Sequence, residues 1–252
     1  ALLCARAALR AGAGMATIAS FAAAATTMQQ QLTELMIALL DDGSREDCAA
    51  SVTRALIKRS AVALGPGMGL GKRAKDVSEQ VVAEFVGPVV VDADAITHFA
   101  GRPEALKASA GPRILTPHSG ELARLLGCSS ADVEAERMQA AQDAARRSGA
   151  VVLLKGYRTV VAPPAEAPAV CLRGGAVLAT AGSGDTLAGI IAALCCHQGV
   201  KQAALAGCMW HALAGEHWQR RHGIDRGMLA SDLSAQLPAA AAAVMAAAQL
   251  DG

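Results

Sequence analysis

Residues 179–189 read Ala-Thr-Ala-Gly-Ser-Gly-Asp-Thr-Leu-Ala-Gly and run directly into the apolar segment 190–194, Ile-Ile-Ala-Ala-Leu. The apolar run predicts a buried helix that begins near Asp185. Gly182 and Gly184 permit backbone conformations that turn successive N–H groups inward. The first turn of a helix adds unpaired N–H donors and the positive end of its dipole. The stretch therefore predicts an anion-binding site at the start of this helix.

A plain helix start also fits this spacing, with Ser183 or Asp185 as the N-cap and one glycine as the turn. Spacing alone does not decide between the two interpretations, although a plain start does not explain why glycine stands on both sides of Ser183. In phosphoryl transfer, donors neutralise the transferred group while a carboxylate accepts the proton of the attacking hydroxyl. An aspartate is ionised at neutral pH, so Asp185 is the predicted catalytic base.

Composition narrows the classes of function. The chain has 252 residues, 53% hydrophobic and 18% charged, which fits one sizeable globular domain over residues 1–252. The formal net charge is +1, so no overall electrostatic surface for nucleic acid or an anionic membrane is expected. Aromatic residues make up 2%, too few for a groove that stacks bases. We therefore expect no nucleic-acid partner and no membrane partner.

The cysteines and the apolar segments bear on location and assembly. The 7 cysteines are scattered without a Cys-x-x-Cys pair, which favours reduced thiols and a cytoplasmic protein. The start of the chain lacks the order of charged and apolar residues typical of a signal peptide, and no strongly apolar run of about 18 residues suggests a membrane span. An Ala-rich segment, residues 239–248, predicts a helix and favours a homo-oligomer.

Runs of Val, Leu and Ile alternate with segments of helical spacing. This pattern predicts an α/β fold with a central, mostly parallel sheet and helices on both of its faces. The predicted strands are residues 15–19, 61–64, 89–92, 113–116 and 151–155, with a hairpin of 159–162 and 169–172. The predicted helices are residues 2–9, 28–40, 48–58, 74–85, 120–126, 131–147, 185–197, 202–220 and 229–248.

A glycine-rich loop, residues 65–72, follows a predicted strand, and ligands of open α/β sheets bind beyond the carboxyl ends of the strands. The loop matches neither the phosphate-loop motif nor the dinucleotide fingerprint. It can bring backbone N–H groups close to a ligand, or it can be a tight turn only, and the sequence leaves both open.

The quoted stretch resembles the anion-hole and base motif of ribokinase-like enzymes. Together with five further motifs in the same order, it makes nearly the whole chain similar to the ADP- or ATP-dependent NAD(P)H-hydrate dehydratases. These motifs are Gly65-Pro66-Gly67-Met68-Gly69, Val91-Asp92-Ala93-Asp94-Ala95, Thr116-Pro117-His118-Ser119-Gly120-Glu121, Leu154-Lys155-Gly156 and Gly227-Met228-Leu229-Ala230-Ser231-Asp232-Leu233.

The resemblance implies a lyase that repairs nicotinamide cofactors. It implies nucleotide-dependent dehydration of (6S)-NADHX or NADPHX to NADH or NADPH, with Mg²⁺ as cofactor and ADP or ATP as co-substrate, ADP giving AMP and phosphate. A phosphorylated hydroxyl leaves readily, pushed by the lone pair of the ring nitrogen, so a kinase-type site can drive a dehydration.

The resemblance also implies roles for individual residues. Asp185 faces the hydroxyl of the hydrate, and Gly67 and His118 match substrate-binding positions, although His118 fits a loop histidine equally well. Asp92 and Asp94 fit water-mediated Mg²⁺ binding or the capping of a helix, so the metal ligands stay unknown, and Asp232 is interpreted as a helix cap. The positions that match nucleotide-binding residues are Lys155, Gly156, Tyr157, Arg158, Thr159, Gly182, Ser183 and Gly184.

The chain departs from the family in one respect. A Gly-rich segment that precedes the first helix in the family has no counterpart before Ala1, nor has the epimerase domain of many bacterial relatives, so we expect an N-terminally incomplete domain. Two alternatives stay open: a ribokinase-like small-molecule kinase, and a nucleotide-binding relative without catalysis. The segments 116–118 and 65–67 favour the dehydratase over the kinase.

Overall fold

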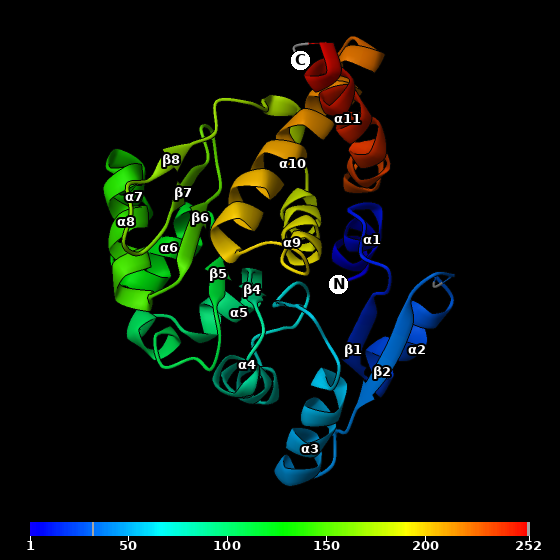
Figure 1. Ribbon diagram of the computed structural model, residues 1–252. Coiled ribbons are helices and arrows are strands. Elements are labelled where there is room, and N and C mark those ends of the chain that lie inside the picture. Colours follow the sequence, from blue (N-terminus) through cyan, green and yellow to red (C-terminus); the bar gives the residue numbers. More distant parts are fainter. Residues whose placement is uncertain (32, 251–252) are drawn as a thin grey trace.

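A six-stranded sheet forms the centre of the protein in the computed structural model, which describes residues 1–31 and 33–250 (Figure 1). The strand order is β3-β4-β5-β6-β7-β8, in which β3 to β6 are parallel and β7 and β8 are antiparallel additions. The mostly parallel sheet and its hairpin are thus confirmed. The strands are β3 (Val62–Leu64), β4 (Val89–Val91), β5 (Arg113–Leu115), β6 (Val151–Leu154), β7 (Val160–Ala162) and β8 (Ala169–Val170).

Both faces of this sheet are buried under helices. Because side chains alternate along a strand, Val89 and Val91 pack into one apolar cluster and Val90 into another on the opposite face. The predicted layers are therefore confirmed. One face is covered by α4 (Lys72–Glu84), α5 (Ala93–His98), α6 (Ser119–Leu126) and α8 (Arg137–Ser148), and the other by α9 (Ser183–Leu194) and α10 (Val200–His222).

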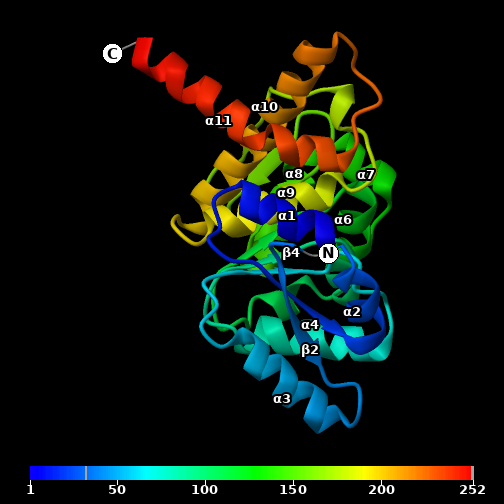
Figure 2. The same cartoon turned by 90° about the vertical axis from the view of Figure 1, so that its right-hand side faces the viewer.

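Chain order explains this division of the helices. Each of the strands β3 to β6 is added beside its predecessor in the same direction, and right-handed crossovers then place the connecting helices on one face. The second face is left for helices from the last third of the chain. Helix α9 is consequently enclosed by the sheet, by α10, by α1 (Leu2–Arg10) and by α11 (Ala230–Leu250) (Figure 2).

A separate two-stranded parallel sheet pairs β1 (Thr17–Phe21) with β2 (Met36–Leu40). The helix predicted over residues 28–40, whose position 32 lies outside the described residues, is present only at residues 28 and 29 and is otherwise wrong. Residues 36–40 instead pair with 17–21, because backbone pairing with a neighbouring strand overrides an apolar spacing that fits a helix as well. Helix α2 (Ala22–Gln29) precedes β2, and α3 (Arg45–Leu56) follows it.

The predicted helix over residues 131–147 is two helices. Helix α7 (Ser130–Ala135) ends at Glu136, whose φ of −133° and ψ of 51° are not helical, and α8 begins at the next residue. A capping box between Ser129 and Asp132 starts the short α7. Two single 3₁₀ turns complete the elements, Pro103–Leu106 and Ala176–Leu178.

The described part of the chain contains no helix with the combined length and hydrophobicity of a membrane span. All seven cysteines are free thiols in the structure.

Close contact between α1 and α9 yields a first prediction. A Cβ built on Gly189 would stand 2.1 Å from the carbonyl oxygen of Cys4 in α1, so a methyl group there must push the two helices apart. Glycine-to-alanine changes inside helices ordinarily raise the free energy of unfolding of a protein by up to about 1 kcal/mol. We expect Gly189→Ala to lower the free energy of unfolding instead, by about 1–3 kcal/mol, in urea denaturation.

The matched control is Gly215→Ala in α10. Its Cβ would meet the Cδ2 methyl of Leu178 at 2.6 Å, and a leucine side chain can move where a backbone carbonyl cannot. The control is expected to lose less stability than Gly189→Ala. Equal losses in the two variants would contradict the steric explanation.

Candidate active site

The start of α9 is held by glycine rather than by a side-chain cap. Gly182 is the N-cap residue with φ of 84°, and no side chain caps the helix, so the plain start with Ser183 or Asp185 as N-cap is wrong. The Gly182 carbonyl accepts the first helical hydrogen bond from Thr186. Among the described residues, the amides of Gly184 and Asp185 have no acceptor, and they are donors available to an anion.

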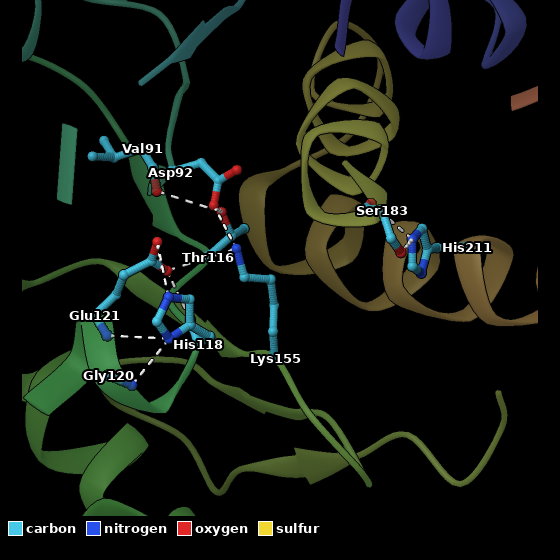
Figure 3. A network of polar contacts seen from close by, with 9 residues as sticks. All are labelled: Val91, Asp92, Thr116, His118, Gly120, Glu121, Lys155, Ser183 and His211. Carbon is cyan, nitrogen blue, oxygen red and sulfur yellow. Dashed lines mark hydrogen bonds and ion pairs between the residues drawn. The ribbon is translucent and has the colours of Figure 1, made fainter. Parts of the chain in front are cut away.

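The side chain of Ser183 points into the protein, where its Oγ lies 3.0 Å from Nε2 of His211 in α10 (Figure 3). Its amide donates to the Thr180 carbonyl at 3.2 Å. The residue is 6% exposed. Ser183 therefore shapes the turn from the inside, and Gly184 presents its backbone towards the site.

Asp185 occupies the first turn of α9, with 29% of its side chain exposed. Burial raises the pKa of the Asp185 carboxyl above its usual value. The positive charge of Lys155 opposes this rise in pKa. The carboxylates of Asp92 and Asp94 add to it. The protein thus holds a carboxylate where its charged form is disfavoured, which is typical of functional acids and bases.

Lys155 follows β6 and lies between two buried carboxylates. Its Nζ is 2.8 Å from Oδ1 of Asp92 and 3.7 Å from Oε2 of Glu121 (Figure 3). Thr116 donates a 2.8 Å hydrogen bond to the same Oδ1. A Cβ on Gly184 would lie 3.2 Å from Nζ, so glycine at that position makes room for the lysine. The ends of β4, β5 and β6 and the start of α9 therefore meet around one ammonium group.

The two aspartates after β4 do not cap α5 in the way that one interpretation allowed. Asp92 is at the N-cap position, yet its side chain makes no capping bond and binds Lys155 instead. Asp94 accepts the amide of Gly69 at 2.8 Å, which ties the glycine-rich loop to α5. Within residues 1–31 and 33–250, no three His, Cys, Asp or Glu side chains gather as a metal site.

The glycine-rich loop bends towards the start of the chain. Gly65 has φ of 119°, and a Cβ there would stand 1.8 Å from the Asp92 carbonyl oxygen, so the turn requires glycine. Gly67 is exposed, and a Cβ on it would lie 3.7 Å from the Ala1 nitrogen, the same atom that lies near Asp185. The loop thus borders the site beside Asp185.

His118 begins α6 in a capping box. Its Nδ1 accepts the amides of Gly120 and Glu121 at 3.0 and 3.4 Å, and Glu121 Oε2 accepts the His118 amide at 2.8 Å. Because Nδ1 is the acceptor, the proton of the neutral ring is on Nε2. His118 therefore has the structural role that the sequence left open as an alternative to substrate binding. Its side chain is 55% exposed and lies at the edge of the site. Sequence reasoning missed Glu121, for which the His-x-x-Glu spacing of a capping box was the available signal.

The rest of the predicted nucleotide-binding segment lies at the surface. Tyr157 is 81% exposed, and the Arg158 guanidinium lies 5.3 Å from the centre of its ring. Thr159 bonds back to the Gly156 carbonyl. Of the predicted residues 155–159, Lys155 is the one whose side chain joins the network at the strand ends.

Asp232 lies at the start of α11. Its side chain accepts a hydrogen bond from the amide of Leu229 at 3.0 Å and supports the start of this helix, as predicted.

A family model described as NAD(P)H-hydrate dehydratase matches residues 1–239. The chain belongs to the NAD(P)H-hydrate dehydratase family. It is 35% identical to the ADP-dependent (S)-NAD(P)H-hydrate dehydratase of Xanthomonas campestris, over 94% of this chain and 81% of the relative. It is 38% identical to the bifunctional NAD(P)H-hydrate repair enzyme of Moorella thermoacetica, over 94% of this chain. The chain spans 45% of that enzyme, about half the length of the first curated relatives that it matches.

Solved structures confirm the fold. The ADP/ATP-dependent NAD(P)H-hydrate dehydratase of Bacillus subtilis, co-crystallised with ATP/Mg²⁺, is 31% identical with a TM-score of 0.81, over 95% of this chain and 83% of that one. A ribokinase-like superfamily protein of Enterococcus faecalis, 24% identical, shares the architecture with a TM-score of 0.77, over 94% of this chain and 80% of that one. The ribokinase-like fold expected for this family member is therefore present.

The raised pKa of Asp185 predicts that this family member is more stable without the charge. When folding raises the pKa of a carboxyl, its charged form destabilises the folded protein. This loss of stability is complete at pH values above the folded-state pKa and absent at pH values below the unfolded-state pKa. We expect Asp185→Asn to raise the melting temperature at pH 7. The gain should vanish as the pH falls through the folded-state pKa to below about 4, the ordinary range of aspartate.

Melting curves of the wild type and of Asp185→Asn between pH 3 and 8 test this. Asp143→Asn is the matched control, because Asp143 is a partly exposed carboxylate in α8, outside the first turn of α9. A gain for Asp185→Asn that is equal at every pH would contradict the linkage.

Proposed function

We propose that this protein dehydrates (6S)-NADHX or NADPHX to NADH or NADPH at the expense of ADP or ATP, and so repairs nicotinamide cofactors. The observation that carries this proposal is the position of Asp185 in the first turn of α9, next to Gly184, where a Cβ would lie 3.2 Å from Lys155 Nζ. Charge donors and a carboxylate base in one place are what phosphoryl transfer to a hydroxyl requires. Family membership favours the nicotinamide hydrate as the molecule that bears the hydroxyl.

In the proposed reaction, the hydrate's hydroxyl oxygen bonds to the terminal phosphorus of the nucleotide as the bond from phosphorus to the bridging oxygen breaks. Asp185 takes the hydroxyl proton. With ADP the leaving group is AMP. The ring nitrogen's lone pair then expels phosphate with cleavage of the C–O bond, and the adjacent ring carbon releases a proton to form the double bond of the dihydronicotinamide. Asp185 is the catalytic residue in this scheme.

The binding roles follow from the same layout. Lys155 and the amides at Gly184 and Asp185 hold the nucleotide's phosphates, and residues 156–159 and 182–183 border the nucleotide. Gly67 and His118 border the hydrate. The carboxylates of Asp92 and Glu121 offset part of the positive charge of Lys155. The positive end of the α9 dipole adds to the charge that remains.

The carboxylates beside Lys155 are suitable ligands for a Mg²⁺ ion that binds together with the nucleotide. Mg²⁺ keeps several waters and binds through one or two carboxylates together with substrate phosphates. Asp92, whose Oδ2 is not engaged by Lys155, and Asp94 are the residues that would hold it. When bound, the ion supplies charge neutralisation on the phosphoryl group.

The decisive assay mixes the protein with Mg²⁺, ADP or ATP and chemically hydrated NADH, and follows the return of dihydronicotinamide absorbance. We expect nucleotide-dependent recovery, with Asp185→Asn reducing kcat by about 10²–10⁴-fold because a general base is removed. Asp143→Asn is expected to leave the rate unchanged, since that carboxylate lies on the surface of α8.

Each alternative has its own outcome in this assay. A ribokinase-like small-molecule kinase would leave a stable phosphorylated alcohol and no recovered absorbance. A nucleotide-binding relative without catalysis would bind ADP in calorimetry with no turnover. Full activity of Asp185→Asn would remove Asp185 as the base.

We further propose one domain over residues 1–252 that acts in the cytoplasm as a homo-oligomer. Free thiols throughout the chain support a reducing location. The second half of α11 projects from the body, with Val244 and Met245 exposed by 50% and 67% (Figure 2). Exposed apolar side chains on a projecting helix support subunit packing.

The oligomer is tested by sedimentation velocity. We expect a species larger than the monomer, and a shift towards monomer in the Val244→Asp, Met245→Asp variant, because charges are costly in an apolar interface. A wild-type protein that is monomeric at micromolar concentration would contradict the proposal.

A further inference from the structure

The contact between His211 and Ser183 is a buried polar contact at the first turn of α9 (Figure 3). His211 lies on α10, 8% exposed, and its Nε2 is 3.0 Å from the Ser183 carbonyl oxygen and 3.0 Å from Ser183 Oγ. A carbonyl oxygen can only accept, so the proton of the ring is on Nε2. Burial lowers the pKa of His211 to about 4, so the imidazole is neutral at physiological pH.

Three contacts confine the turn that carries Ser183. On one side, a Cβ on Gly182 would meet Leu3 of α1 at 2.4 Å. On the side of the site, a Cβ on Gly184 would meet Lys155 Nζ at 3.2 Å. From the interior, the imidazole of His211 holds Ser183 by its carbonyl and its hydroxyl. The contacts at Gly182 and Gly184 are steric, whereas the contact with His211 is made by hydrogen bonds.

The location of this contact is informative. Farther along, α9 and α10 pack through apolar groups, as where a Cβ on Gly207 would stand 2.6 Å from Cγ1 of Ile191. A buried histidine contributes less to stability than an apolar side chain of similar size unless its polar atoms are matched. Here Nε2 of His211 is paired with Ser183, in the turn that carries the amides of Gly184 and Asp185 and the Asp185 carboxylate.

We propose that His211 is a positioning residue, which fixes the first turn of α9 so that the Gly184 and Asp185 amides and the Asp185 carboxylate face the site. This inference rests on the proposed function for the consequence in catalysis. Its structural part, the fixing of residues 182–186, stands apart from any activity. His211 acts through Ser183 and touches no substrate.

Two substitutions at position 211 separate the donor from the volume. Glutamine carries an amide N–H at a reach close to that of Nε2, whereas methionine fills similar space without a donor. We expect His211→Met to lower kcat by about 10-fold or more, since small misplacements of a catalytic group are costly. The KM for ADP should change less, because Lys155 keeps its place on Asp92. His211→Gln should restore kcat to near that of the wild type.

Two further measurements exclude a general loss of stability. Leu237→Val, in the core between α10 and α11, is the control, because Leu237 is fully buried and outside the first turn of α9. It should lower the melting temperature without lowering kcat at the assay temperature. Adding His211→Met to Asp185→Asn should slow the enzyme by a smaller factor than His211→Met slows the wild type, because the loss of a positioned base is then already present.

Amide hydrogen exchange tests the positioning without any substrate. His211→Met should speed exchange in residues 182–187, and His211→Gln should not. If the two variants exchange and turn over alike, or if Leu237→Val lowers kcat as much as His211→Met, the positioning role is wrong. If the wild type shows no turnover while exchange responds as expected, the proposed function fails and the positioning of the turn stands.

Discussion

The buried ion pair between Lys155 and Asp92 is the interaction on which the site depends. Parallel strands end at the same edge of a sheet, so β4, β5 and β6 deliver Asp92, Thr116 and Lys155 to one place. Removing one partner of a buried pair leaves an uncompensated charge at a cost of several kcal/mol. The ion pair therefore fixes the ammonium group of Lys155. Because this group lies beside Gly184, the pair decides where an anion can bind.

The helix that faces this pair is placed by close packing. Gly182 and Gly189 lie where larger residues would collide with Leu3 and with the Cys4 carbonyl, so α1 lies directly on α9. Asp185 in the first turn of this helix is half-buried, and burial raises its pKa, which costs stability at neutral pH. A carboxylate retained under that penalty is consistent with a functional role rather than a stabilising one.

Prediction from the sequence succeeded where local signals and tertiary structure agree. The runs of Val and Leu that are buried on both faces, and the helices between them, were predicted from spacing. Residues 36–40 were assigned to a helix, because their pairing with 17–21 is a long-range contact that an apolar spacing does not reveal. The break at Glu136 has the same origin, since the chain turns there so that α8 can pack against the sheet.

The sequence by itself determined the residue types of the site and their order along the chain, because the glycines of 182–184 and the carboxylate of Asp185 carry their chemistry wherever they lie. The tertiary structure decided which of these groups meet. It paired Lys155 with Asp92, turned Ser183 inward onto His211 and left Tyr157 and Arg158 at the surface. The physical reason is that an ion pair or a buried hydrogen bond depends on distance in space, which residues far apart in sequence acquire only when the sheet and its helices have packed.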